Sequence, residues 1–239
     1  MASIKEKLAE NTIIESLRWS SSPLARDDIN VLEAFKNSNI KELALESNGL
    51  DEECIKALIP ILQHHLNKSL KSLSLRGNAI TKSELDLLVT AVQGTQLEDL
   101  NLSECDIDTE GAKRIAKLLE RKEGIKTLKF NGNKISPEGW EAIGDSLADN
   151  TSLLNLEINS NDLGNKGCRV IAEALNENEK LTSLQVENNN IGDEGGEKLV
   201  ELVKENEFIE KILAKEGNQI DTKLLHEMEE ILETGTFVD

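Results

Sequence analysis

The chain of 239 residues carries 27 basic and 45 acidic side chains, a net charge of −18, and only 3% of its residues are aromatic. This excess of carboxylates makes nucleic acids and anionic membrane surfaces poor partners. No run of 18 apolar residues predicts a membrane-spanning helix, and the amino-terminal segment lacks the apolar core of a signal peptide.

The first predicted element is a short helix over residues 1–13. Ser3 and Glu6 have the spacing of a capping box, in which each side chain accepts a hydrogen bond from the backbone of the other residue. Ile4 and Leu8 are one helical turn apart and therefore share one side of this helix. We expect the helix to cover the first end of the region that follows.

From Ile14 onward, the pattern L-x-x-L-x-L-x-x-N-x-L recurs at intervals of about 28 residues. Its clearest copy runs from Leu153 to Leu163. Positions 1, 4, 6 and 11 of the pattern are apolar, which predicts that they point inward. The eight copies begin at Ile14, Ile40, Leu70, Leu97, Ile125, Leu153, Leu181 and Ile209.

Position 9 of the pattern is predicted to be structural. An asparagine amide has donors and an acceptor, so at a buried bend it can satisfy backbone groups of its own loop and of its neighbours. Smaller polar groups replace it at Ser22 and Cys105, and in the last copy the asparagine comes one residue late. The asparagines of this column are Asn48, Asn78, Asn133, Asn161, Asn189 and Asn218.

The second half of each repeat has helical periodicity. Apolar residues follow the i, i+3, i+4 spacing of one helix face, as at Ile115, Leu118 and Leu119. In the four most regular repeats, position 15 is a glycine, where we expect helix and strand backbones to approach closely. These glycines are Gly111, Gly139, Gly167 and Gly195.

Each repeat is therefore predicted to be a short strand, a bend and a helix. Such a unit cannot bury both of its faces alone, so about eight of them should stack into an α/β solenoid with a parallel sheet. Helices are wider than the roughly 4.8 Å between strands, so the stack should curve with strands on the concave side and helices on the convex side. We expect one domain over residues 14–239, capped by the irregular last repeat from about residue 209.

These motifs resemble the ribonuclease-inhibitor type of leucine-rich repeat, which uses a strand-and-helix unit of this length with glycine or alanine at position 15. The resemblance covers the chain from Ile14 onward. It implies a horseshoe segment, and it implies no particular activity because one scaffold can serve many functions.

Function is expected on the concave strand face and its loop rim. Basic and acidic residues nearly balance at those positions, whereas the excess acid lies outside, and this mixed surface suits a folded protein better than a polyanion. The face measures on the order of 700 Å², close to the roughly 800 Å² per side of a standard protein interface. The candidate partner-binding residues are Arg18, Glu46, Arg76, Asn101, Ser103, Lys129, Asn131, Glu157, Asn159, Gln185 and Glu187.

We find no sign of an enzyme, a cofactor site or a metal site in the sequence. The adjacent His64 and His65 point about 100° apart on a helix, and no P-loop, dinucleotide fingerprint or GxSxG motif occurs. The three cysteines, Cys54, Cys105 and Cys168, have no CxxC spacing, which indicates reduced thiols in the cytoplasm. The sequence thus favours a monomeric, non-catalytic protein that binds one protein partner, without nucleic acid or membrane.

Several roles for such a protein remain open. By resemblance it is an inhibitor of an enzyme or a regulator of another effector; the alternatives are a GTPase activator resembling Ran-directed repeat proteins and an actin-capping domain resembling tropomodulin. The carboxy-terminal stretch is also similar to the glutamate-rich ends of effectors exported by bacterial type IV secretion, which act in a host cytosol. Its glutamates are Glu227, Glu229, Glu230 and Glu233.

Overall fold

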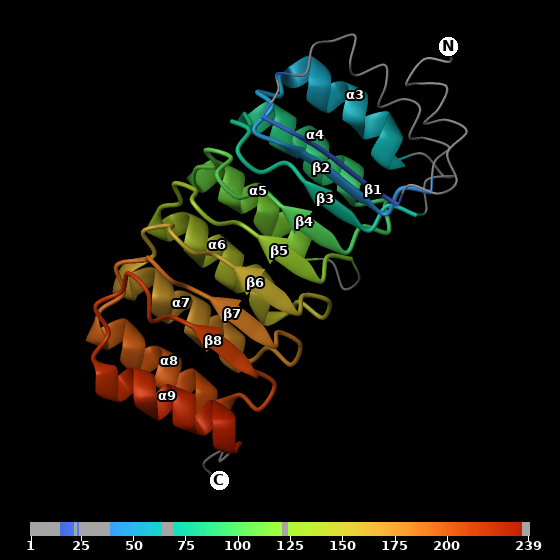
Figure 1. Cartoon of the computed structure of the whole chain (residues 1–239). Helices are drawn as coiled ribbons and strands as arrows, with labels where there is room; N and C mark the ends of the chain where they lie inside the picture. The colour runs from blue at the N-terminus through green and yellow to red at the C-terminus, as the bar shows by residue number, and fades with distance from the viewer. Residues whose placement is uncertain (1–14, 22, 24–38, 64–68, 121–123, 236–239) are drawn as a thin grey trace, which may run out of the picture. The chain divides into compact units, whose positions relative to one another are not determined.

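The computed structural model describes residues 15–21, 23, 39–63, 69–120 and 124–235 (Figure 1). Its contacts divide the chain into two compact units, Met1–Asp106 and Ile107–Asp239. The capping helix predicted over residues 1–13 lies outside the described residues. The expectation of a single domain over 14–239 remains a prediction.

The first unit contains four parallel strands in chain order. Three strand pairs align the leucine at position 4 of one repeat with that of the next, as in the register of Leu43 with Leu73 and of Leu73 with Leu100. The described elements are β1 (Ser16–Ser20), β2 (Glu42–Glu46), α3 (Glu52–Gln63), β3 (Ser72–Ser74), α4 (Lys82–Val92) and β4 (Asp99–Asn101).

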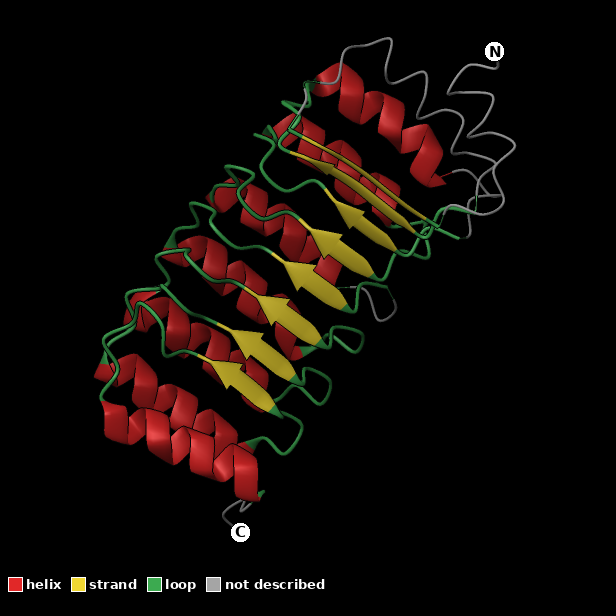
Figure 2. Ribbon diagram, viewed as in Figure 1, coloured by secondary structure: helices red, strands yellow, loops and turns green. Residues whose placement is uncertain are grey.

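The second unit repeats the same arrangement more regularly. Strands β5 to β8 are parallel neighbours, and helices α5 to α8 form a layer on one side of them (Figure 2). The helix α9 packs against α8. The elements are α5 (Thr109–Leu119), β5 (Thr127–Lys129), α6 (Pro137–Ala148), β6 (Asn155–Glu157), α7 (Gly164–Asn176), β7 (Ser183–Gln185), α8 (Asp193–Glu205), β8 (Lys211–Leu213) and α9 (Thr222–Thr234).

The core of each unit lies between its strands and its helices. In β5, β6 and β7 the central leucine is buried and its two neighbours are half-buried, as the period-2 alternation of a strand requires. The position-6 side chains are also buried, from Leu45 to Ala214. The predicted leucine-rich-repeat α/β solenoid, with parallel strands alternating with helices, is confirmed.

Local sequence signals explain where several helices begin. Thr81 and Glu84 form a complete capping box at α4, and the Asp108 carboxylate accepts a hydrogen bond from the Gly111 backbone at α5. Pro137 occupies the first turn of α6, where its missing N–H would have had no helical partner.

The position-9 asparagines form the predicted hydrogen-bond ladder. In the second unit, Oδ1 of Asn161 accepts from the Asn133 backbone at 2.9 Å, and its Nδ2 donates to the Phe130 carbonyl of the preceding repeat at 3.0 Å. Asn189 makes the same contacts with the repeat of Asn161. Their burial and bonding confirm that these residues hold successive bends together.

A second asparagine ladder lies where the helices end. Asn178 donates to the Leu147 carbonyl at 2.6 Å and accepts from the Leu181 backbone at 2.8 Å. Asn150 and Asn206 bond in the same way at the preceding and following repeats. Each of these residues comes three positions before a repeat start, so the column could have been found in the sequence by extending the alignment backward.

Candidate functional site

The strand face of the second unit carries the polar side chains that alternate with its core residues. Here "strand face" means positions 3, 5 and 7 of the four repeats with strands β5 to β8. These are Thr127, Lys129, Asn131, Asn155, Glu157, Asn159, Ser183, Gln185, Glu187, Lys211, Leu213 and Lys215. Six of the eleven predicted partner-binding residues lie on this face.

Three of them form one contact cluster across adjacent strands. Lys129 Nζ lies 2.8 Å from a Glu157 carboxylate oxygen, and Asn131 Nδ2 donates to the other oxygen at 3.2 Å. The Glu157 side chain is only 17% exposed, whereas that of Lys129 is 41% exposed. The acid is therefore held in place while the lysine remains accessible to a partner.

The amide side chains extend this cluster to the next repeat. Oδ1 of Asn131 accepts from the Asn159 backbone, and Oδ1 of Asn159 accepts from the Glu187 backbone, each at 2.7 Å. Asn159 also donates to Gln185 Oε1 at 3.4 Å. Because backbone hydrogen bonds fix these side chains, the polar surface is largely preorganised, which lowers the entropy cost of binding.

The other five predicted residues lie in the first unit. Arg18 is exposed on β1, and Glu46 accepts a hydrogen bond from the Ser74 hydroxyl at 2.7 Å. Arg76 is exposed and pairs with Glu104 at 2.6 Å. Asn101 Oδ1 accepts from the backbone of Ser103 at 3.0 Å. Ser103 itself is only 3% exposed, so it offers a partner little surface.

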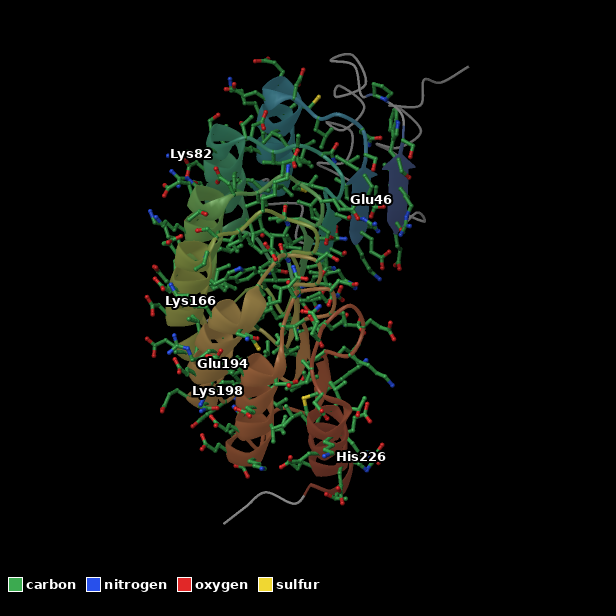
Figure 3. The ribbon with its side chains drawn as sticks, turned by 90° about the vertical axis from the view of Figure 1, so that its left-hand side faces the viewer. Glu46, Lys82, Lys166, Glu194, Lys198 and His226 are labelled. Carbon is green, nitrogen blue, oxygen red and sulfur yellow. The ribbon has the colours of Figure 1, made fainter. Side chains whose placement is uncertain are left out.

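Several charges on the helix side of the second unit are paired within the chain. Lys166 of α7 lies 3.1 Å from Glu141 of α6, and Lys198 pairs with Glu201 inside α8. Lys166, Glu194 and Lys198 lie on the helix side, away from the strands (Figure 3). These exposed pairs contribute little stability each.

Two further features favour a packing role over a site. Trp140 is fully buried in α6, so it is not an exposed binding residue on the helix side. Within the described residues, no group of three or more His, Cys, Asp or Glu side chains is arranged to hold a metal ion. No helix in the same residues is long and apolar enough to cross a membrane.

The cysteine thiols are buried and unreactive in character. Burial raises the pKa of Cys105 and of Cys168 to about 12. Cys105 also takes the place of asparagine in the first ladder, where its Sγ lies 3.3 Å from the Leu75 carbonyl oxygen. A thiolate is the reactive form of cysteine, so neither residue is suited to nucleophilic chemistry.

This burial predicts a pH dependence of stability. A thiol whose pKa is higher in the folded protein stabilises the fold fully below its unfolded pKa, and this stabilisation is lost as the pH rises from about 9 towards about 12. From pH 8 to pH 10, we expect wild type to lose about 1 kcal/mol more unfolding free energy than Cys168→Ala. Urea denaturation at both pH values measures this difference; equal losses would contradict it.

Comparisons with known proteins support the repeat architecture. A family model described as "Leucine Rich repeat" matches residues 66–83, 95–116, 125–144, 149–172 and 177–200. The FERM domain-containing protein C of Dictyostelium discoideum is 28% identical over 135 residues, 55% of this chain. The match spans only 9% of the length of that relative.

Two solved structures have a similar fold. The leiomodin-1 actin-binding site 2 matches with a TM-score of 0.53 and 21% identity, covering 63% of this chain and 86% of that one. The tropomodulin C-terminal domain of Caenorhabditis elegans matches with a TM-score of 0.51 and 16% identity, covering 75% and 91% respectively. At these identities the likeness concerns the fold alone. The family model thus shows leucine-rich repeats in the five matched segments between residues 66 and 200.

Proposed function

We propose that this protein is a non-catalytic interaction module that binds one folded protein partner on its strand face and loop rim. The observation that supports this most is the cluster of Lys129, Glu157 and Asn131 and its extension through Asn159 and Gln185. It presents both charges and several amides on a surface that backbone hydrogen bonds hold in place. Such a surface selects a partner by electrostatic and hydrogen-bond complementarity.

In this proposal the protein is a cytoplasmic monomer that acts by steric occlusion, as an inhibitor or regulator of the protein it binds. The resemblance to the ribonuclease-inhibitor type of repeat supports this mode. The ladder-braced strands support it further, because a preorganised face can cover a partner surface without first becoming ordered.

A charge exchange tests the strand face without losing the internal salt bridge. We expect Lys129→Glu combined with Glu157→Lys to keep a bridge across β5 and β6 while reversing the pattern that a partner meets. Binding of the captured partner should weaken at least tenfold, about 1.4 kcal/mol. Affinity purification from native cytosol identifies the partner. Titration calorimetry then measures the affinity of the wild-type protein and of the exchange variant for that partner.

The matched control exchanges the two residues of a salt bridge on the helix side. Glu141→Lys with Lys166→Glu alters the same number of charges at a pair separated by 3.1 Å. This control should bind within twofold of wild type. If both exchanges weaken binding equally, or if neither does, the strand-face proposal is wrong.

A second candidate function is actin binding in the manner of a tropomodulin-like domain. It is favoured by the fold shared with a structure named as an actin-binding site of leiomodin-1 and with a tropomodulin domain. Cosedimentation with actin filaments and pointed-end elongation assays test it directly. Slower pointed-end elongation that the Lys129 and Glu157 exchange relieves would support actin as the partner.

A further inference from the structure

The second unit carries another surface, separate from the strand face, where its helices end and its strands begin. We name it the strand-entry rim and define it as Glu120 with residues 148–154, 176–182 and 204–210. The exposed large apolar side chains among the described residues are Leu154 and Phe208, at 36% and 39% exposure, and both lie on this rim. Exposed apolar side chains that gather on one surface indicate an interaction site.

Two adjacent grooves run along this rim. One, of about 470 Å³, lies between the loops after α5, α6 and α7, and Glu120 and Asp149 line it. The next, of about 490 Å³, lies between the loops after α7 and α8, and Phe208 lines it. Glu177 and Glu179 line both grooves, so the two grooves are neighbours that share the loop after α7.

The charge of the rim is unfavourable for the isolated protein. The residues that cap the ends of α5, α6 and α7 are Glu120, Asp149 and Glu177, so each carboxylate faces the negative end of a helix dipole. At the end of α8, Glu205 and Glu207 flank Asn206. Helix stability alone would favour lysine or arginine at such positions.

Several acids elsewhere in the unit are paired with lysine. Glu157 of the strand face and Glu141 and Glu201 of the helix side each have a lysine within 3.1 Å or less. In the described part of the unit, no lysine or arginine pairs with the five rim carboxylates Glu120, Asp149, Glu177, Glu179 and Glu207. Lys180 lines the first groove, and Lys204 lines the second, where it pairs with Glu227 at 2.6 Å.

The backbone below the grooves is held by the second asparagine ladder. Asn178 donates to the Asn150 carbonyl at 2.9 Å, and Asn206 donates to the Asn178 carbonyl at 2.8 Å. Asn206 Oδ1 also accepts from the Phe208 backbone at 2.8 Å, which fixes the start of that exposed side chain. The acids and Phe208 are therefore presented on a braced surface.

We propose that the strand-entry rim binds a basic, extended segment of a partner protein that also carries apolar residues. Carboxylates and helix C-termini attract lysine and arginine, while Leu154 and Phe208 provide apolar contacts. Leu154 and Phe208 lie two strands apart and are offset by two residues along the strand direction. These spacings separate the two side chains by about 12 Å. Apolar residues four apart in an extended segment span about the same distance.

The test uses a defined peptide. A fluorescein-labelled twelve-residue peptide of lysine, with leucine at every fourth position, is titrated with the full chain and followed by fluorescence anisotropy. Binding should weaken at least tenfold when Glu177, Glu179 and Glu207 are all changed to Gln. Binding should weaken at least threefold in Phe208→Ser. It should weaken by the same factor when the wild-type protein meets a peptide in which serine replaces the leucines.

The matched control neutralises three exposed helical carboxylates of the same unit, with Asp145→Asn, Glu197→Gln and Glu230→Gln. It should bind the peptide within twofold of wild type, as should the exchange of Lys129 and Glu157, because neither alters the rim. Equal weakening in the two triple variants, or no effect of Phe208→Ser, would overturn the proposal. Thermal melts that match wild type confirm that each variant is folded.

Discussion

Replacing Asn189 by alanine should lower the free energy of unfolding by about 3–5 kcal/mol. The Asn189 side chain is fully buried and accepts hydrogen bonds from the backbones of Asn161, at 2.9 Å, and Leu163, at 3.2 Å. It also donates to the carbonyls of Ile158 and Glu187. Alanine leaves these buried backbone groups without partners, and each such group costs about 1–3 kcal/mol.

Asn155 provides the matched control. It is a half-buried asparagine on β6, and its Nδ2 makes one long hydrogen bond, 3.4 Å, to the Thr127 hydroxyl. Asn155→Ala should change the unfolding free energy by less than about 1 kcal/mol. Urea denaturation measures both variants; similar losses would mean that the buried ladder contributes no more than an ordinary surface amide.

We expect Gly195→Ala to destabilise the protein by about 2 kcal/mol. A methyl group at this position would lie 2.5 Å from Ile191 Cγ2, 3.0 Å from Asn165 Oδ1 and 3.3 Å from Cys168 Cβ. Asn165 Oδ1 accepts from the backbones of Gly192 and Gly195, so its displacement also weakens the start of α8. Overpacking costs about 1–3 kcal/mol, which outweighs the roughly 1 kcal/mol that alanine gains in helix propensity.

Gly94→Ala is the control for this second substitution. No atom beyond its chain neighbours lies within 4 Å of a methyl group at Gly94. The change should therefore leave the midpoint of thermal unfolding within about 2 °C of wild type, while Gly195→Ala lowers it by several degrees. A Gly195→Ala protein as stable as wild type would show that α8 can shift without cost.

The same contacts correct one expectation from the sequence. Position-15 glycines were expected where helix and strand backbones approach. At Gly139 and Gly195 the space is instead limited by the position-11 side chain, Ile135 or Ile191, and by the helix of the preceding repeat. The sequence marks the need for a small residue, but it does not reveal which neighbour imposes it.

The fold was predictable because its determinants recur in columns. Leucines at position 4 and asparagines at position 9 are spaced by the repeat, so each copy supports the interpretation of the others. The ladder of Asn150, Asn178 and Asn206 was missed because these residues precede the repeat start and look like ordinary helix-end residues. Alignment from the helix ends would have found them.

The candidate site was only partly predictable. The repeat register predicts that Lys129, Glu157 and Gln185 lie side by side, because each occupies position 5 of its repeat and the three strands are neighbours. Which side chains pair depends on rotamers and loop bonding, as in the Lys129 contact with Glu157. The burial of Ser103 depends on the bend around it, which a strand pattern does not describe.

The ladder also limits how such a protein can change in length. Asn133, Asn161 and Asn189 are 28 residues apart, and each bonds backward and forward through the same atoms. An insertion or deletion of a whole repeat therefore leaves every remaining amide with an equivalent partner, whereas a change of a few residues inside a bend leaves several without one. The strand face of the second unit can thus grow or shrink by whole strands, in steps of about 4.8 Å.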